Sequence, residues 1–176
     1  KKLTLVVLME ADVGFNAIDF RGPEKSAQQI FQVSGRSGRH NDKGEIILQT
    51  YDANNPILLS LIRNGYKSFA ENELQIREKM RFPPFRPMAI IRADAKSAGT
   101  AENFLSSINH KLSDYETLGP APALVSKISN RYRFQLMILA DNRRLLDQAL
   151  TAVQASYKKT GNGGLRWSID VDPIEI

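Results

Sequence analysis

RYRFQLMIL, residues 131–139, is the stretch of the sequence that decides the fold. Apolar side chains occupy every second position from Tyr132 to Ile138, and Arg131, Arg133 and Gln135 occupy positions between them. Successive side chains of a β-strand point to opposite faces of its sheet. The pattern therefore predicts a strand with one apolar face, which helices must cover, and one polar face.

The sequence on both sides of this strand predicts a small α+β domain. Apolar runs indicate further strands, and apolar residues at helical spacing indicate two helices. The expected elements, in order, are strand 88–94, helix 101–112, strand 123–128, strand 131–139, helix 145–157 and strand 165–171. The order βαββαβ is that of a ferredoxin-like sheet with both helices on one face. We expect the other face to be open.

Basic side chains are expected on the open face of this sheet. No acidic residue occurs between Glu116 and Asp141, so the segment is locally positive. The residues that we expect to gather there are Lys127, Arg131, Arg133, Arg92 and Arg166. Contact with nucleic-acid phosphates would explain them, and such contacts make binding depend on salt. An ordinary solvated sheet face is the alternative.

Aromatic side chains are expected in the core of this domain. The alternation places Tyr132, Phe134 and Trp167 on the helix side, away from the basic residues. Single-strand binders stack bases on exposed aromatic rings. We therefore expect a surface that holds phosphates and does not read bases.

Residues 55–87 predict a helical connector. An apolar stripe from Ile57 to Ile62 stops at Asn64-Gly65, and a second helical pattern runs from about Tyr66 to Met80. Pro83 and Pro84 follow, and consecutive prolines cannot continue a helix. We place a domain boundary there.

Residues 1–54 predict a slice of an α/β layer. The apolar run Leu3–Met9 is typical of a strand buried on both faces of a parallel sheet. A loop over Asp12–Phe20, a helix beginning near Pro23 and a strand over Glu45–Thr50 are expected to follow. The slice is too small for a complete layer. The predicted domains are therefore 1–54, 55–87 and 88–176.

The helix of this slice leads into the sequence QVSGRSGR, residues 32–39. Arg36 and Arg39 are three residues apart, so both guanidinium groups can point into one cleft. Guanidinium is a planar fork of donors that suits the spread charge of a phosphoryl group in transfer. Gly35 and Gly38 let the backbone come close to such a ligand. A solvated basic turn is the alternative.

An ordered set of landmarks resembles the C-terminal part of the primosomal replication-restart DNA helicases, a family of helicase superfamily two. Besides QVSGRSGR, the landmarks are Asp19-Phe20-Arg21 with Glu24, Gly44-Glu45, Leu48-Gln49-Thr50, Gly65-Tyr66, Phe69-Ala70-Glu71, Arg77, Pro83-Pro84-Phe85, Arg92-Ala93, Leu118-Gly119-Pro120, Arg131-Tyr132-Arg133 and Asp170-Val171-Asp172-Pro173. They extend over nearly the full chain. A fragment of an RNA helicase would rest on QVSGRSGR alone and leaves residues 55–176 unexplained.

The resemblance implies an ATP-dependent helicase that moves 3′ to 5′ on DNA and reloads the replication machinery at stalled forks. Residues 1–54 would form the C-terminal end of the second RecA-like lobe. Gln32, Arg36 and Arg39 would face the γ-phosphate of ATP, with Gly35 and Gly38 beside the nucleotide. The implied partners are forked or branched DNA, the single-strand DNA-binding protein and primosome proteins, in the bacterial cytoplasm at the nucleoid.

Several parts that the resemblance requires do not occur in this sequence. There is no G-x-x-x-x-G-K-[ST] to hold the triphosphate and no D-E-x-H to hold magnesium. The resemblance also implies zinc-binding cysteines, which lie upstream of this region in the family, and this chain has no cysteine. We therefore expect ATP, magnesium and zinc to belong to a longer parent, none to be bound by this chain alone, and no ATPase activity from it.

Composition sets broad limits on the function. A hydrophobic content of 42% indicates a globular protein, and a net charge of +5 is compatible with an anionic partner. His40 and His110 are lone, so a metal site is not expected. No apolar run approaches the length of a membrane span. The rival to an enzyme fragment is a non-enzymatic module in which residues 88–176 bind protein.

Overall fold

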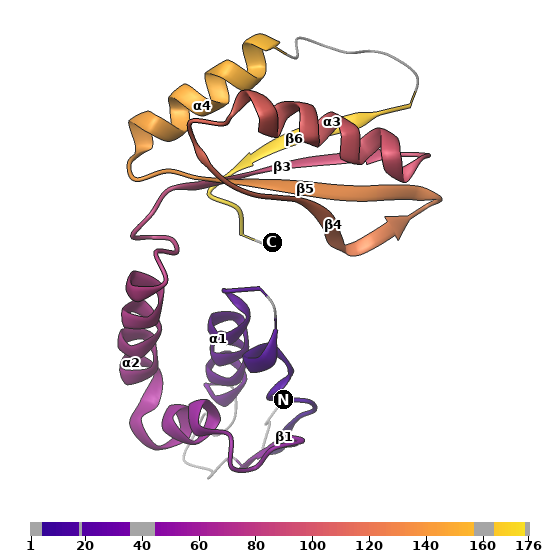
Figure 1. Ribbon diagram of the computed structural model, residues 1–176. Helices are drawn as coiled ribbons and strands as arrows, with labels where there is room; N and C mark the ends of the chain where they lie inside the picture. Colours follow the sequence, from indigo (N-terminus) through magenta and orange to yellow (C-terminus); the bar gives the residue numbers. More distant parts are fainter. Residues whose placement is uncertain (1–4, 18, 36–44, 157–163, 175–176) are drawn as a thin grey trace. The chain divides into compact units, whose positions relative to one another are not determined.

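The computed structural model describes residues 5–17, 19–35, 45–156 and 164–174, and it divides into two compact units, residues 1–79 and 80–176. The first unit contains β1 (Leu5–Leu8), the 3₁₀ helix η1 (Val13–Asn16), α1 (Gly22–Ser34), β2 (Glu45–Leu48) and α2 (Pro56–Lys79). The second contains β3 (Met88–Ala95), α3 (Ala98–Lys111), β4 (Glu116–Ile128), β5 (Arg131–Leu139), α4 (Arg143–Ser156) and β6 (Arg166–Val171) (Figure 1). The division into three domains remains a prediction. In the described parts, no helix has the length and apolar character needed to cross a bilayer.

The first unit is built on two parallel strands and the helix between them. β1 pairs with β2 in parallel, as the sequence predicts. The helix α1 buries Ala27 and Ile30 in a core that also contains Leu8 and Leu48. The expected burial of the first strand on both faces is wrong, because Val7 is 52% exposed. Only the face toward α1 is covered in the described part of the unit.

The connector forms one bent element. α2 consists of two helical halves that meet at Gly65, whose φ is +79° and ψ is 175°. These angles lie in a region that is essentially restricted to glycine. The first half buries Leu58 and Leu61, and the second buries Phe69. The break that the sequence predicts at Asn64-Gly65 is therefore confirmed.

We expect Gly65→Ala to destabilise α2 by about 1 to 3 kcal/mol, the usual cost of a side chain at such backbone angles. No atom lies within 4 Å of the position of an added Cβ, so the cost arises in the backbone alone. Hydrogen exchange of the amides of α2 measures the change. Gly99→Ala in α3 is the control, because Gly99 has no positive φ and an open environment. Slower exchange in Gly65→Ala would contradict the prediction.

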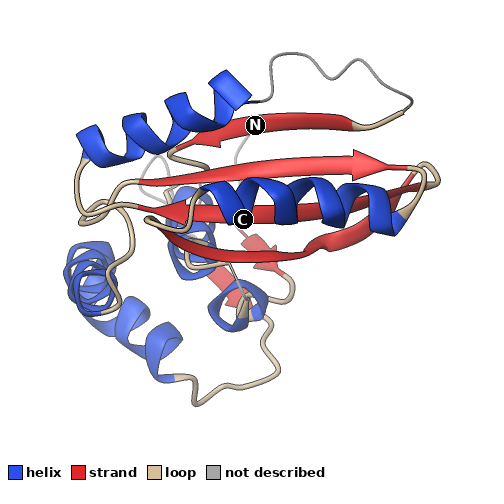
Figure 2. Ribbon diagram, turned by 45° about the horizontal axis from the view of Figure 1, so that its top comes forward, coloured by secondary structure: helices blue, strands red, loops and turns tan. Residues whose placement is uncertain are grey.

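The second unit is a four-stranded antiparallel sheet in the described residues, with α3 and α4 on one face (Figure 2). The strand order is β4-β5-β3-β6, so β3 lies in the interior between β5 and β6. The order βαββαβ along the chain agrees with the sequence prediction. β4 and β5 are joined by Ser129 and Asn130, which both have positive φ, as the type I′ turn of a two-residue hairpin requires.

The core of the second unit lies between the sheet and the two helices. Ala89, Ile91 and Ala93 of β3 pack there with alternate residues of β5 and one face of each helix. Ala101 and Leu105 of α3 are fully buried, which confirms the apolar stripe predicted for this helix. Small side chains on the central strand allow the helices to approach the sheet closely.

β4 begins earlier than the sequence predicts, at Glu116 instead of Ala123. The sequence does not predict this first part of β4, because it contains Gly119, Pro120 and Pro122, and these residue types usually interrupt a sheet. Proline has no backbone N–H to donate to a neighbouring strand. β4 tolerates proline because it is an edge strand, with a neighbouring strand on one side only. Its ladder with β5 is irregular in two places, after Leu118 and after Pro122.

The face of the sheet opposite the helices is only partly open. Ile90 points to this face and is fully buried. The chain after β6 passes beneath this part of the sheet, where Pro173 is buried and the amide of Asp172 donates a hydrogen bond to the carbonyl of Met88 (Figure 1). We call the remaining part, around Arg92, Asp94 and Arg133, the open face. The sequence-based expectation of a fully uncovered face is corrected accordingly.

An arginine cluster fixes the segment by which the chain enters the second unit. Arg86 is 6% exposed, and its guanidinium donates to Glu116 at 2.6 Å and lies 3.2 Å from Asp141. Arg81 also binds Asp141, at 2.5 Å. The hydrogen bond from Arg86 lowers the pKa of Glu116. These contacts hold the start of β4 and the chain before α4 to the entering segment.

Candidate nucleic-acid interface

Two arginines on the open face have no counter-ion in the described residues. Arg133 of β5 and Arg166 of β6 line one hollow, together with Arg92, Asp94 and Ser168. In this part of the chain, neither Arg133 nor Arg166 forms an ion pair or a side-chain hydrogen bond. Each therefore presents an uncompensated positive charge to a ligand in the hollow.

The two carboxylates near these arginines are already paired. Asp170 accepts a hydrogen bond from Arg92 at 2.7 Å. Asp94 accepts one from Nε of Arg131, whose Nη2 also donates to the backbone carbonyls of Asp94 and Gly164. Since these pairs neutralise the acids, the charge that remains in the hollow is positive. Arg131 thus has a structural role in linking β5, β3 and the start of β6.

The structure does not bring Lys127 to the open face. Lys127 lies directly opposite Tyr132 across the β4–β5 ladder, so both side chains are on the side of the helices. The ammonium nitrogen lies 4.6 Å from the centroid of the Tyr132 ring and 3.3 Å from its hydroxyl oxygen. The expectation that Lys127 joins Arg131 and Arg133 on one surface is therefore corrected. The physical reason is the break in register after Pro122.

The aromatic residues lie where the alternation predicts. Phe134 is buried in the core, and Tyr132 and Trp167 pack against it. The ring of Trp167 contacts that of Phe104 from α3, with 5.7 Å between the centroids. The rings of this core are therefore engaged on the helix side. Along β5 and β6, the positions that alternate with these aromatic residues face the open side of the sheet and carry charged or polar side chains.

The arginine motif falls largely outside the described residues. Arg36, Gly38 and Arg39 lie beyond them, so their placement near a nucleotide stays a prediction. Gln32 is exposed near the end of α1 and lines a shallow hollow with Gln28 and neighbouring residues. Gly35 follows the helix with a φ of −69°, which any residue adopts. The structure therefore gives no backbone reason for glycine at position 35.

A partly buried ion cluster in the first unit joins residues that are among the sequence landmarks. Glu24 of α1 accepts hydrogen bonds from Arg21 at 3.3 Å and from Arg77 of α2 at 2.9 Å. The Arg77 guanidinium lies 5.2 Å from the centroid of the Phe20 ring. Burial tends to raise the pKa of Glu24, but the hydrogen bonds from both arginines outweigh it and the pKa is lowered. The cluster fixes α1 against the second half of α2.

Asp12 joins the two segments that leave the parallel strands. Its side chain is buried, and its Oδ2 accepts hydrogen bonds from the amides of Tyr51 and Asp52, both at 3.1 Å. A hydrogen bond with the Thr50 side chain is the main cause that lowers the pKa of Asp12. The carboxylate therefore holds the ends of β1 and β2 in one arrangement.

We expect Asp12 to make the stability of the first unit dependent on pH. A carboxyl whose pKa is lower in the folded state contributes stability above its unfolded pKa of about 3.9, and this contribution is lost as the pH falls toward the folded pKa. Asp12→Asn should flatten the decrease in thermal stability that the parent shows as the pH falls below about 5. Melting temperatures across this range test it, with the exposed Asp52→Asn as the control. Parallel curves for Asp12→Asn and the parent would contradict it.

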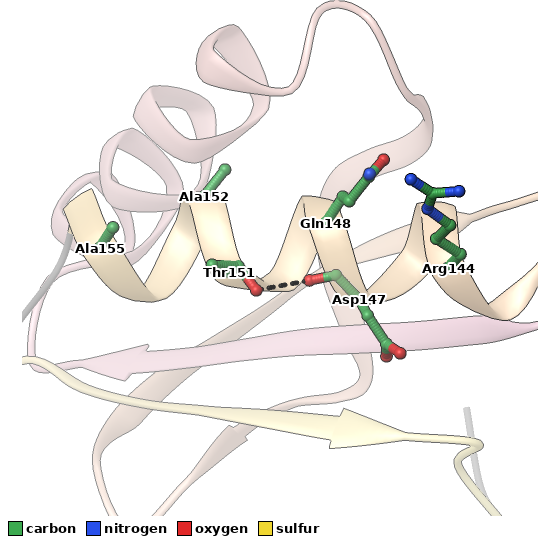
Figure 3. Close-up of a pocket in the computed structure, with 6 residues that line it drawn as sticks. All are labelled: Arg144, Asp147, Gln148, Thr151, Ala152 and Ala155. Carbon is green, nitrogen blue, oxygen red and sulfur yellow. Dashed lines mark hydrogen bonds between the residues drawn. The ribbon is translucent and has the colours of Figure 1, made fainter.

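A second surface of the C-terminal unit is a shallow hollow along α4 (Figure 3). Its lining residues all belong to this helix: Arg144, Asp147, Gln148, Thr151, Ala152 and Ala155. The Thr151 hydroxyl donates a hydrogen bond to the backbone carbonyl of Asp147 at 2.7 Å, so it is occupied within the helix. Charges of both signs lie beside small apolar side chains. This surface is separate from the open face, because α4 covers the other side of the sheet.

Comparison with known proteins supports the family resemblance inferred from the landmarks. The chain is 38% identical to replication restart protein PriA of Haemophilus influenzae, 31% to that of Synechocystis sp. and 31% to that of Bacillus subtilis. The matches cover 99%, 99% and 97% of this chain and 24%, 21% and 22% of those proteins. The chain thus spans about a quarter of the length of these relatives.

The family model of the primosomal protein N C-terminal domain matches residues 78–174. This range contains every element of the sheet unit described above, from β3 to β6. The resemblance that the landmarks indicated is confirmed. The chain belongs to the family of the primosomal protein N C-terminal domain.

Proposed function

We propose that this chain is the C-terminal part of an ATP-dependent DNA helicase that moves 3′ to 5′, restarts stalled replication forks and assembles the primosome. The family match and the relatives named replication restart protein support the proposal. The sequence QVSGRSGR at 32–39 supports the helicase assignment. The proposed place of action is the bacterial nucleoid, in the cytoplasm.

Two features of the first unit support its assignment to the end of a RecA-like motor lobe. Two parallel strands flank α1, which leads directly into the arginine motif. In the parent, Arg36 and Arg39 would stabilise charge on the γ-phosphate of ATP, with Gln32 beside them. ATP and magnesium would be held mainly by the other lobe, and zinc by cysteines upstream of this region.

The second unit is proposed to bind forked or branched DNA through its open face. A ferredoxin-like sheet with both helices on one side leaves a surface for such a partner, and its strand order supports this assignment. The observation that carries the proposal is the pair Arg133 and Arg166, which line one hollow without counter-ions in the described chain. Arg92 lies in the same hollow but is paired with Asp170.

A protein-binding module is the second candidate. The hollow along α4 supports it, because exposed Arg144 and Gln148 lie there beside small apolar residues. The single-strand DNA-binding protein and primosome proteins are the proposed partners of the parent. The two candidates use opposite sides of the sheet, so one unit can serve both.

We expect Arg133→Gln/Arg166→Gln to weaken the binding of this chain to forked DNA. Each lost phosphate contact should lower the slope of log affinity against log salt by about 1. Fluorescence anisotropy over a series of salt concentrations measures both affinity and slope. The matched control is Lys127→Gln/Arg144→Gln, which removes the same charge from the helix side of the sheet.

Two results of this experiment would contradict the interface. Equal weakening by both double variants would show that only net charge matters. Unchanged binding by Arg133→Gln/Arg166→Gln would show that DNA does not contact the open face. Arg131 is unsuitable for this test, because its contacts with Asp94 and Gly164 are structural.

In a longer parent that restores the upstream lobe, we expect Arg36→Ala or Arg39→Ala to lower ATP turnover by about 10³-fold or more. Arginines that stabilise transition-state charge contribute on this scale. Steady-state ATPase assays with single-stranded DNA measure the effect, with the exposed Arg63→Ala in α2 as the control. An unimpaired motor would contradict the assignment of both arginines, and DNA-stimulated turnover by the present chain alone would contradict its proposed dependence on the missing lobe.

A further inference from the structure

The open face is shaped by a large irregularity in β4. Pro122 pairs with Phe134 and Lys127 pairs with Tyr132, so the four residues 123–126 stand opposite Arg133 alone. An excess of residues on one strand bends it and breaks the ladder locally. β4 bends away from the side that α3 and α4 occupy, as Figure 1 shows. The bulged segment therefore rises beside Arg133 on the open face.

This bulge carries aliphatic side chains to the rim of the hollow. Leu124 is 69% exposed and Val125 is 54% exposed. Both line a second hollow, together with Gln135 of β5, Asp170 of β6 and Ile174 from the chain after β6. The two hollows share Arg92, Ala123 and Arg133.

Because they share these residues, the two hollows form one continuous depression, which we call the β4 groove. Its floor carries Arg133 and, toward one end, Arg166, while Leu124 and Val125 form one wall. The groove thus combines uncompensated positive charge with aliphatic surface that no described residue covers. A ligand that fits it must offer both negative charge and apolar area.

We propose that the β4 groove binds single-stranded DNA, with phosphates on Arg133 and Arg166 and base faces against Leu124, Val125 and Ile174. The proposal rests on the proposed DNA-binding function and adds the form of DNA that this face accepts. A duplex presents its charged backbone and keeps base faces stacked inside. A single strand exposes base faces, which bury apolar area against aliphatic side chains.

The aliphatic wall also explains how bases are contacted without aromatic platforms. Tyr132, Phe134 and Trp167 are engaged on the helix side of the sheet. Leu124 and Val125 have no polar atoms that could read base edges, so the groove should bind single strands with little sequence preference. We expect the groove to discriminate between single-stranded and double-stranded DNA.

The test uses the 176-residue chain and fluorescence anisotropy with a 20-nucleotide oligothymidylate and a 20-base-pair duplex. The wall variant is Leu124→Ser/Val125→Ser. The matched control is Ile62→Ser/Ile76→Ser, which changes two exposed aliphatic residues of α2. Circular dichroism and the fluorescence of Trp167 confirm that each variant is folded.

We expect the parent chain to bind the oligothymidylate more tightly than the duplex at equal salt. The wall variant should lose roughly fivefold to tenfold in affinity for the single strand, as the loss of partial apolar burial at two side chains implies. Its affinity for the duplex and the salt slope should stay unchanged. The control variant should bind both forms as the parent does.

Each other outcome overturns a stated part of the proposal. If the wall variant binds the single strand like the parent while Arg133→Gln/Arg166→Gln does not, the groove assignment is wrong and the DNA-binding function stands. If Arg133→Gln/Arg166→Gln keeps full affinity, the proposed function fails and the groove assignment fails with it. Equal affinity of the groove for polyglutamate and for oligothymidylate would indicate an acidic protein partner and would also overturn the proposal.

Discussion

The alternation of side chains along β3 is the constraint on which the C-terminal unit depends. β3 lies between β5 and β6, so both of its edges are paired and its residues cannot change sides without disrupting two ladders. Ala89, Ile91 and Ala93 must then pack under the helices. Arg92 and Asp94, at the positions between, are forced to the opposite face. The charged chemistry of that face is thus a direct consequence of the apolar packing beneath the helices.

Much of this unit could be predicted from the sequence, because its signals are local. The alternation in residues 131–139 gave the buried set Phe134, Leu136 and Ile138 and placed Arg133 on the other face, as the structure shows. The helical spacing of Ala101 and Leu105 likewise predicted the packed face of α3. Period-two and helical patterns depend only on neighbouring residues, so a single sequence suffices to read them.

The parts that sequence reasoning missed depend on contacts between distant residues or on irregular backbone. Arg131 is tied to Asp94 across the sheet, and nothing local distinguishes it from Arg133. Lys127 follows a bulge that shifts its alternation relative to β5. In the first unit, Arg77 meets Glu24 from a different helix. Each of these cases requires the strand register or the helix packing, which no short-range pattern contains.

The irregular edge strand β4 has a consequence for how copies of this protein meet one another. A long, regular sheet edge offers a row of unpaired amides and carbonyls on which a second molecule can add a strand and begin to aggregate. Pro120 and Pro122 remove two such donors, and the bulge at 123–126 breaks the straight line that an incoming strand would need. The same distortion that shapes a ligand groove therefore discourages edge-to-edge association between neighbouring chains.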